Sequence, residues 1–224
     1  MSVEQKIYGH RWDTADLREV RRVWNTLVES FFQPLIGDNK TVLDIGCGFC
    51  HFLNAIKASE KWGVDANEAT ASFAAPDVRL IISDDLRLLE LPDAYFDCVF
   101  LSNFLEHLDS SARVIALLER VRELLKPGGE VIILQPNFRL LGASYFDFID
   151  HKTILTDRSV REALEIAGLK LRMQVTRFLP YTTKSRFPRH PSLVRLYLRL
   201  RPLWRLLGKQ SLFVAEKRTA LGDA

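Results

Sequence analysis

The sequence contains few cysteines and no long apolar segment. Only three of its 224 residues are cysteine, which is too few, and odd in number, for a disulfide framework. No apolar run reaches the roughly 18 to 20 residues that are needed to cross a bilayer, because charged residues interrupt every run. The chain also opens without a charged and apolar leader of the cleavable kind. We therefore expect a cytoplasmic protein that does not span a membrane.

Acidic residues are absent from one segment, residues 178–210. Eight of the 31 Lys and Arg residues lie there, so the rest of the chain carries more acidic than basic groups although the net charge is +3. This asymmetry predicts a basic module on an acidic body. No repeat or low-complexity segment is present, and a chain of this length with 47% hydrophobic residues can bury one sizeable core. We expect one domain with added segments.

Hydrophobic spacing predicts alternating helices and strands. Apolar residues recur every three or four positions before residue 40, which predicts a helical cap within residues 1–39. A helix is also predicted at 110–125, where Lys-Pro-Gly-Gly ends it, and another begins at Asp157, a candidate N-cap. Since these alternate with short runs rich in branched residues, we predict an α/β fold with a mainly parallel sheet. The predicted strands are 41–45, 62–65, 78–83, 96–101, 130–134 and 212–216.

The most informative motif is Val-Leu-Asp-Ile-Gly-Cys-Gly-Phe-Cys at residues 42–50, a predicted strand that runs into a glycine turn and a helix. Glycine lets the backbone approach a ligand closely. The motif has G-x-G without the spaced third glycine of the dinucleotide fingerprint. Asp44 before the turn is unfavourable beside a pyrophosphate and suits a cationic or amine-bearing ligand. A tight turn with a capping acid, in another nucleotide-binding Rossmann domain, is the alternative interpretation.

Further acidic residues follow the next two predicted strands. Asp65, nineteen residues after Gly46, is placed to accept hydrogen bonds from two ribose hydroxyls. Asp84 and Asp85 follow the third strand, where a carboxylate can accept a hydrogen bond from an adenine amino group and Leu86 can cover the ring. A polar turn is the alternative interpretation of this pair. Three acids at three successive strand ends predict one crevice.

Together these motifs resemble those of class I S-adenosylmethionine-dependent methyltransferases. The likeness covers residues 40–137, and it is closest to the bacterial small-molecule group known as type 11. In that group Ser-Asn-Phe-Leu-Glu-His-Leu after a strand and a Leu-Lys-Pro-Gly-Gly turn are characteristic. The resemblance implies one methyltransferase domain over 1–224 with a cofactor-binding core at 40–177. It also implies a Rossmann-like, mainly parallel seven-stranded sheet with helices on both faces and a last antiparallel strand at 211–217.

The resemblance further implies S-adenosylmethionine as the cofactor. The glycine turn would hold the methionine moiety, Asp65 the ribose and the acidic pair after the third strand the adenine. Residues after the fourth strand would lie near the sulfonium. Cys50 departs from the family pattern, which commonly has glycine there. The implied cofactor-binding residues are Asp44, Gly46, Cys47, Gly48, Asp65, Ala66, Asp84, Asp85, Leu86, Ser102 and Asn103.

Two histidines are candidate catalytic residues. An acceptor hydroxyl has to lose a proton when it is methylated, and a base with a pKa of about 7 does this economically. His107 follows the fourth predicted strand, and His151 lies past the fifth, with Asp147 and Asp150 near enough in sequence to orient it. We expect His107 or His151 as the base, with His151 favoured. A cap or ion pair on the next helix is the alternative role of Glu106 and His107.

No metal site is expected from the sequence. Cys47 and Cys50 form C-x-x-C, a spacing that is typical of redox and zinc sites. No second such pair exists, however, and this one lies inside the glycine turn. We therefore predict neither redox chemistry nor zinc binding.

The basic segment 178–210 is predicted to form an amphipathic helical insertion before the last strand. Pro191 can start a helix with leucines on one face and arginines on another, and Pro202 interrupts it. One interpretation is a lid over the acceptor, with the arginines in solvent or on an anionic substrate. The other is contact with an anionic membrane through residues 186–209. Nucleic acid fits less well, because the interleaved residues are mainly leucines rather than stacking aromatics.

These features lead us to predict an enzyme, an O-methyltransferase acting on a hydroxyl of a small molecule. A glycan, a sugar phosphate or a lipid-linked intermediate would suit both the lid and the membrane interpretation. The membrane interpretation would place the protein at the inner face of the membrane. A function of a different class is a membrane-surface or regulatory module that binds the cofactor without catalysis. A third interpretation keeps the fold and exchanges the cofactor for a dinucleotide.

Overall fold

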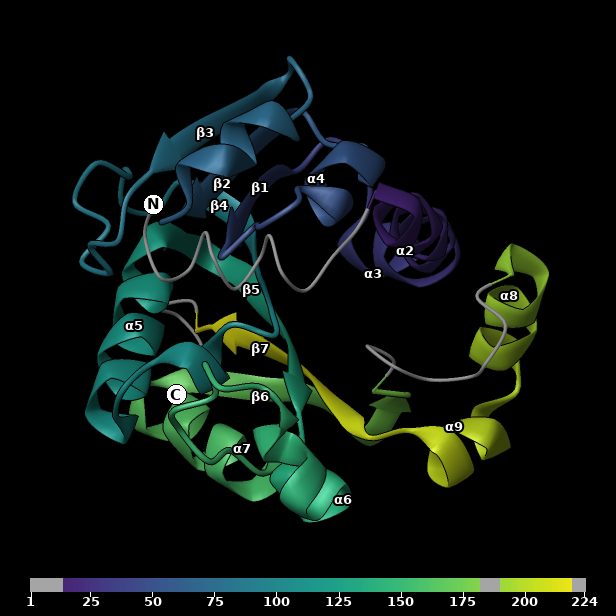
Figure 1. Cartoon of the computed structure of the whole chain (residues 1–224). Helices are drawn as coiled ribbons and strands as arrows, with labels where there is room; N and C mark the ends of the chain where they lie inside the picture. The colour runs from purple at the N-terminus through teal and green to yellow at the C-terminus, as the bar shows by residue number, and fades with distance from the viewer. Residues whose placement is uncertain (1–13, 182–189, 219–224) are drawn as a thin grey trace.

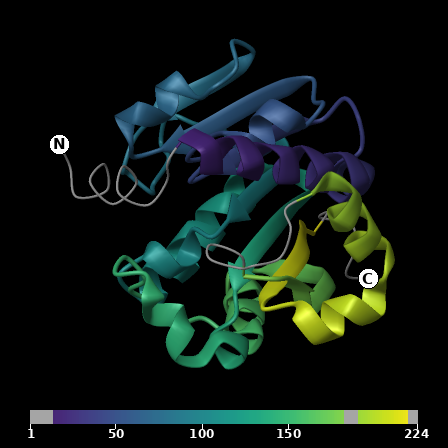
Figure 2. The ribbon, with the colours of Figure 1, turned by 45° about the vertical axis from the view of Figure 1, so that its right-hand side comes forward.

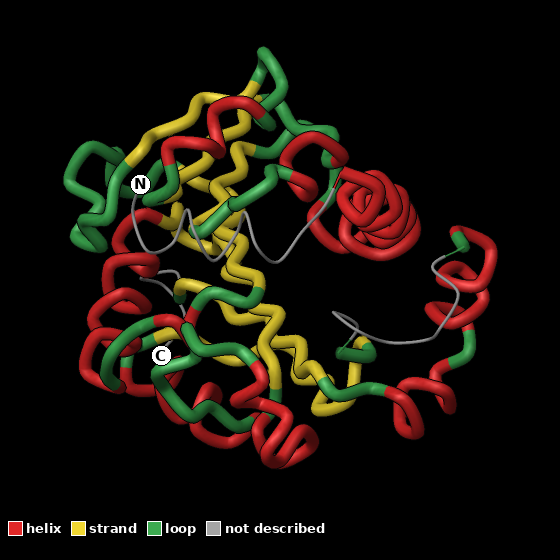
Figure 3. Tube along the Cα trace, viewed as in Figure 1, coloured by secondary structure: helices red, strands yellow, loops and turns green. Residues whose placement is uncertain are grey.

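The computed structural model describes residues 14–181 and 190–218. At its centre lies a seven-stranded sheet with the strand order β3-β2-β1-β4-β5-β7-β6 (Figure 1 and Figure 3). Strand β7 pairs antiparallel with β5 and β6, and the pairs among β1 to β5 are parallel. This confirms the predicted Rossmann-like fold. The strands are β1 (Thr41–Ile45), β2 (Glu60–Asp65), β3 (Val78–Ile82), β4 (Phe96–Ser102), β5 (Leu125–Pro136), β6 (Leu169–Leu179) and β7 (Gln210–Lys217).

Helices lie on both faces of the sheet (Figure 1). The α-helices are α2 (Thr14–Leu27), α3 (Gln33–Ile36), α4 (His51–Ala55), α5 (Ser111–Leu124), α6 (Phe138–Leu141), α7 (Asp157–Ile166), α8 (Pro191–Arg199) and α9 (Arg201–Leu207). Shorter helical turns are η1 (Val28–Phe32), η2 (Glu68–Ser72), η3 (Leu105–His107) and η4 (Gly142–Asp147). The helix predicted before residue 40 is α2, continued by η1 and α3; its first 13 positions lie outside the described residues.

Two hydrophobic clusters sandwich the sheet because neighbouring strand residues point to opposite faces. Leu43 and Val99 join a cluster with α5 and α7, whereas Val42 and Phe100 join a cluster with α2, α4 and α9. Strand β1 is buried along its whole length. Burial on both faces explains why these strands read as continuous apolar runs rather than alternating ones.

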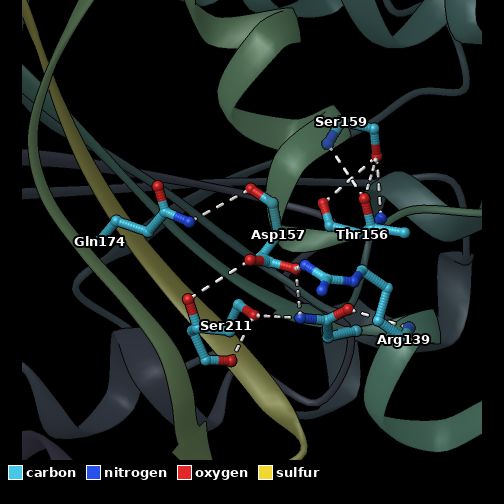
Figure 4. Close-up of polar contacts among 8 residues, drawn as sticks. Arg139, Thr156, Asp157, Ser159, Gln174 and Ser211 are labelled. Carbon is cyan, nitrogen blue, oxygen red and sulfur yellow. Dashed lines mark hydrogen bonds and ion pairs between the residues drawn. The ribbon is translucent and has the colours of Figure 1, made fainter.

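Helix α7 begins at Asp157 as predicted, but its N-cap residue differs from the prediction. The N-cap is Thr156 and not Asp157: the Thr156 hydroxyl accepts a hydrogen bond from Ser159 N at 3.1 Å, and Ser159 Oγ accepts one from Thr156 N at 2.8 Å (Figure 4). Asp157 is buried and accepts hydrogen bonds from Asn137 and Arg139, both at 3.1 Å. Thr and Asp are both favourable caps, so spacing alone could not choose between adjacent ones.

The turn after α5 also differs in part. The helix ends before Lys-Pro-Gly-Gly as predicted, but the chain extends at once, and β5 begins at Leu125 rather than at residue 130. Leu125 pairs with Phe96 ahead of an irregularity in the β4–β5 register. A Cβ atom on Gly129 would lie 3.0 Å from the Phe96 carbonyl oxygen, so a glycine allows this close approach.

Helices α8 and α9 connect β6 to β7, and α8 lies beside α2 (Figure 2). Arg195 on α8 forms an ion pair with Glu29 at 2.8 Å. Trp204 on α9 is buried against Phe178, with the ring centroids 5.0 Å apart, and its Nε1 donates to the Tyr197 carbonyl at 2.9 Å. The ion pair thus joins α8 to η1, the hydrogen bond joins α8 to α9, and the ring contact holds α9 against β6. Within the described residues no helix is both long and apolar enough to span a membrane.

Candidate active site

The glycine turn after β1 is tightly constrained. Gly46 N and Cys47 N both donate to the Val64 carbonyl, at 2.8 and 3.2 Å, which ties the turn to β2. Gly46 has a φ of 74°, and a Cβ atom there would lie 2.2 Å from a ring carbon of Phe104. Only glycine satisfies both conditions. Cys50 takes a left-handed conformation as the residue that precedes α4.

Asp44 lies at the end of β1 and faces a cavity. Its side chain is almost completely buried. Burial raises its pKa well above the usual range, and negative charge on Cys50 and Asp65 acts in the same direction. A buried carboxylate is most stable beside a cation. This position therefore favours a ligand that carries a positive charge, as the sequence predicts.

Asp65 ends β2 beside the glycine turn. Its carboxylate accepts hydrogen bonds from Gly48 N at 2.7 Å and from Asn67 N at 2.8 Å. These two bonds fix its orientation, and a carboxylate has further lone pairs for hydroxyl donors. Ala66, the next residue, is exposed. The turn and the ribose candidate thus share one hydrogen-bonded unit.

The residues predicted to bind adenine follow β3. They are not among the residues that line the cavity. Asp84 is exposed. Asp85 is engaged by Arg87, whose guanidinium donates to both carboxylate oxygens at 2.8 to 3.0 Å. Leu86 is half-buried and packs against the core cluster that contains Leu43. The acidic pair therefore lies on the loop that follows β3.

The segment after β4 forms the other wall of the cavity. Asn103 has a φ of 50°, and its backbone N–H donates to the Leu134 carbonyl at 2.9 Å. Ser102 and Asn103 both line the cavity. Glu106, in η3, is fully buried and also lines the cavity. Its Oε2 accepts a hydrogen bond from Gln135 at 3.0 Å, and burial raises its pKa.

The structure brings the two predicted catalytic histidines together. The rings of His107 and His151 lie 5.3 Å apart, and both line the cavity. His107 Nδ1 lies 3.0 Å from the Asp150 carbonyl oxygen and 3.5 Å from its carboxylate. His151 Nε2 lies 3.9 Å from Glu106 Oε1. The sequence suggested Asp150 as a residue that could orient His151. In the structure Asp150 contacts His107.

The loop that carries His151 is held against η3 by the backbone. The Glu106 carbonyl accepts hydrogen bonds from Lys152 N at 2.8 Å and from Thr153 N at 3.1 Å. The ring of Tyr145 packs against His151, with the centroids 4.9 Å apart. Segments 45 residues apart in the chain thus build one site. Ser110 and not Glu106 caps α5, so the capping alternative for Glu106 is wrong.

The cavity has a volume of about 490 Å³. It extends from the glycine turn and η3 to apolar residues of α2, α8 and α9. Sequence reasoning missed three of its polar lining residues: Glu106 as a site residue, Gln210, and His51. Burial lowers the pKa of His51 to about 4. The Glu-His pair directly after a strand could have identified Glu106 as a site residue. No local sequence pattern identifies Gln210 or His51.

The C-x-x-C pair lies in the interior of the protein. Cys47, Cys50 and Cys98 are all buried free thiols. The Cys47 and Cys50 sulfurs lie 3.9 Å apart in a hydrogen bond, and this bond together with burial raises the pKa of Cys47. The same hydrogen bond lowers the pKa of Cys50.

Residues 17–174 match a family model described as a methyltransferase domain. The match covers well over half of the chain, so the protein belongs to this methyltransferase family. No curated protein matches the chain at a significant level.

Solved structures share the fold over most of the chain. One is an S-adenosylmethionine-dependent methyltransferase from Archaeoglobus fulgidus, which is 23% identical, with a TM-score of 0.62 over 92% of this chain and 100% of that one. Another, from Haloferax volcanii, was solved with the Trm112 methyltransferase activator; it is 19% identical, with a TM-score of 0.64 over 92% and 96%. A third, from Thermotoga maritima, is described as a "possible histamine N-methyltransferase"; it is 17% identical, with a TM-score of 0.63 over 89% and 92%.

Family and fold together confirm the predicted class. The protein is a class I methyltransferase, and S-adenosylmethionine is the cofactor of this class. The strand order with an antiparallel β7 is the architecture on which that class is built. The cavity lies where the ends of β1 and β4 meet, which is where ligands bind in open α/β sheets.

Proposed function

We propose that this protein transfers a methyl group from S-adenosylmethionine to a hydroxyl of a small-molecule acceptor, namely a glycan, a sugar phosphate or a lipid-linked intermediate. The observation that supports this proposal is that one cavity is lined both by the glycine turn with Asp44 and by His107 and His151. The proposed donor site and the proposed proton-accepting groups therefore share one cavity. A shared cavity can hold two reactants in the orientation that the reaction needs.

The residues after β1, β2 and β4 fit the cofactor. Asp44 would receive its ammonium group and the turn at Gly46 to Gly48 its methionine carboxylate, with Cys47 in the same turn. Asp65 and Ala66 would hold the ribose, and Ser102 and Asn103 would lie near the sulfonium. The adenine would lie against Asp84, Asp85 and Leu86. When bound, the cofactor supplies a methyl group that is already electrophilic, so the chain mainly has to place and deprotonate the acceptor.

His107 and His151 would activate the acceptor hydroxyl. Because a carbonyl oxygen can only accept, His107 Nδ1 is the atom that donates to the Asp150 carbonyl at 3.0 Å. In the neutral imidazole this leaves the lone pair on Nε2. The imidazole that lines the cavity therefore keeps one basic nitrogen.

Helices α8 and α9 would act as a lid over the acceptor. The apolar residues that they contribute to the cavity lining are Leu193, Val194, Leu196, Tyr197, Leu203 and Leu207. Their arginines are exposed, as expected for contact with solvent or an anionic acceptor. Contact with an anionic membrane through residues 186–209 would instead use outward leucines such as Leu206, which is 73% exposed.

The cofactor half of the proposal is tested by calorimetric titration of S-adenosylhomocysteine into the wild type, Asp65→Ala and Glu119→Ala. Glu119 is an exposed residue of α5 away from the cavity and serves as the control. We expect binding to the wild type and the control, and at least tenfold weaker binding to Asp65→Ala. Equal affinity of all three proteins would contradict the assignment of Asp65.

The acceptor half is tested with a cell extract and methyl-labelled S-adenosylmethionine, followed by mass spectrometry. A labelled O-methyl product that is absent with His107→Gln and His151→Gln supports the proposal. A product labelled on nitrogen or carbon would overturn the hydroxyl assignment while leaving the methyltransferase intact.

A further inference from the structure

Glu106, His107 and His151 form a cluster that the proton-transfer role does not explain. Each offers one ligand atom, and these atoms all lie within 4.8 Å of one another. Glu106 and His107 come from η3, whereas His151 comes from the loop after η4. Removing one proton from an acceptor requires a single imidazole. Two imidazoles and a buried carboxylate are more than this proton transfer requires.

The buried carboxylate is only half satisfied. Glu106 Oε2 accepts a hydrogen bond from Gln135, but Oε1 is buried without a hydrogen-bond partner among the described residues. His151 Nε2 lies 3.9 Å from it, which is too far for a hydrogen bond. Leaving a buried carboxylate oxygen without a partner is unfavourable. A cation between these two atoms would satisfy the oxygen.

The separations suit a metal ion. Bonds from imidazole nitrogen and carboxylate oxygen to such an ion measure about 2.0 to 2.2 Å, so two ligands on opposite sides of it lie at most about 4.4 Å apart. The 3.9 Å between His151 Nε2 and Glu106 Oε1 falls within this span. The widest pair of the cluster needs only a shift of a few tenths of an ångström, which side-chain rotation supplies.

Hydrogen bonds from neighbouring residues orient the three candidate ligands, as hydrogen bonds around metal sites do. A ligating histidine usually donates its other ring N–H to a carbonyl or carboxylate. His107 does this through Nδ1 to Asp150, which leaves Nε2 for the ion. Gln135 fixes Glu106, and the backbone bonds from Lys152 and Thr153 to the Glu106 carbonyl hold the His151 loop in place.

We propose that Glu106, His107 and His151 bind a divalent transition-metal cation, such as Mn²⁺ or Zn²⁺, that activates the acceptor hydroxyl. Two imidazoles and one carboxylate suit these ions and leave positions open toward the cavity that all three residues line. The binding site stands on the cluster itself, whereas the activating role rests on the proposed methyl transfer. The two imidazoles then act through the cation rather than by taking the proton directly.

The chemical step balances without an oxidant or reductant. A cation lowers the pKa of a hydroxyl that binds to it. The acceptor O–H bond breaks and the proton leaves to solvent, the O–CH₃ bond forms and the S–CH₃ bond breaks. S-adenosylhomocysteine leaves as a neutral thioether.

The test is Mn²⁺ binding to the full chain after treatment with a chelator, followed by electron paramagnetic resonance, with Zn²⁺ measured by competition with an indicator dye. We expect one equivalent to bind to the wild type. Glu106→Gln keeps the shape of the side chain and removes its charge, and His107→Gln removes a half-exposed ligand; each should weaken binding at least tenfold. The control is His190→Gln, an exposed histidine outside the cluster, which should bind like the wild type.

Binding of S-adenosylhomocysteine, measured on the same samples, separates the two proposals. Cofactor binding without Mn²⁺ or Zn²⁺ binding overturns the metal site and leaves the methyltransferase. Wild-type metal affinity in Glu106→Gln and His107→Gln, with cofactor binding intact, also overturns it. Methyl transfer that stops with the chelator and returns with Mn²⁺ supports the activating role. Transfer that is indifferent to the chelator overturns that role and leaves the imidazoles as bases.

Discussion

Asp44 combines a buried carboxyl group with a place in the cavity wall. Its pKa is raised by burial, so it is higher in the folded than in the unfolded chain. Such a group lowers the free energy of unfolding as the pH rises from the unfolded pKa, about 4, toward the folded one. Asp44→Asn removes this titration. We expect the ligand-free variant to be more stable than the wild type at pH 7 and equally stable near pH 4, as measured by urea unfolding.

The same substitution should weaken S-adenosylhomocysteine binding about ten- to hundredfold, because a charge-assisted hydrogen bond contributes about 1.5 to 3 kcal/mol. Glu119→Gln on the exposed face of α5 should change neither property. Lower stability of Asp44→Asn at pH 7 would contradict the raised pKa of Asp44. Wild-type affinity of the variant for the ligand would exclude the carboxylate as the partner of an ammonium group.

Gly46 is the position where the glycine turn after β1 contacts Phe104, the residue that precedes η3. Gly46→Ala should lower the free energy of unfolding by about 1 to 3 kcal/mol, because its Cβ would overlap the Phe104 ring in addition to the unfavourable φ of 74°. Gly142 is the matched control: its φ is 56°, but a Cβ there meets nothing within 4 Å. Gly142→Ala should cost less than Gly46→Ala, because only the backbone conformation opposes it. Equal effects in chemical denaturation would exclude the clash with Phe104.

At the scale of elements, the sequence predicted the strands that lie between two helical layers, because burial on both faces makes them apolar without interruption. The sequence also predicted the glycine turn after β1, because the strand, the glycines and Asp44 are contiguous in the chain. It could not predict that His151 lies near Glu106, because this depends on hydrogen bonds from Lys152 N and Thr153 N to the Glu106 carbonyl, across more than 45 residues of the chain. The N-cap of α7 was assigned to Asp157 instead of Thr156 for a local reason, because both residues are favourable caps.

The pair α8 and α9 offers two leucines that separate a lid from a membrane contact. Leu196 lines the cavity and is 50% exposed, whereas Leu206 is 73% exposed and is not part of the cavity lining. Leu196→Lys should raise the KM for the acceptor several-fold and leave S-adenosylhomocysteine affinity unchanged, because it places a charge in the acceptor space. Leu206→Lys should leave both unchanged. Steady-state kinetics with the labelled acceptor measures this.

Liposome sedimentation with anionic lipid completes the comparison. We expect both leucine variants and the wild type to remain in the supernatant. Sedimentation of the wild type that Leu206→Lys abolishes and Leu196→Lys retains would contradict the lid and establish the membrane contact instead.

The whole molecule joins two hydrophobic clusters through one sheet, and the cavity lies where the helices of the second cluster approach the carboxyl ends of β1 and β4. A ligand that binds there binds only the folded chain, because its contacts come from distant segments. At a concentration about 100 times its Kd it should add about 2.7 kcal/mol to the free energy of unfolding. For a chain of this size that raises Tm by about 5 to 10 °C.

We expect this shift with S-adenosylhomocysteine and none with NAD at the same concentration, since Asp44 disfavours a pyrophosphate beside the turn. A comparable shift with NAD in the same thermal scan would mean that the glycine turn accepts a dinucleotide. The fold would then stand unchanged, and the assignment of the donor site would fall.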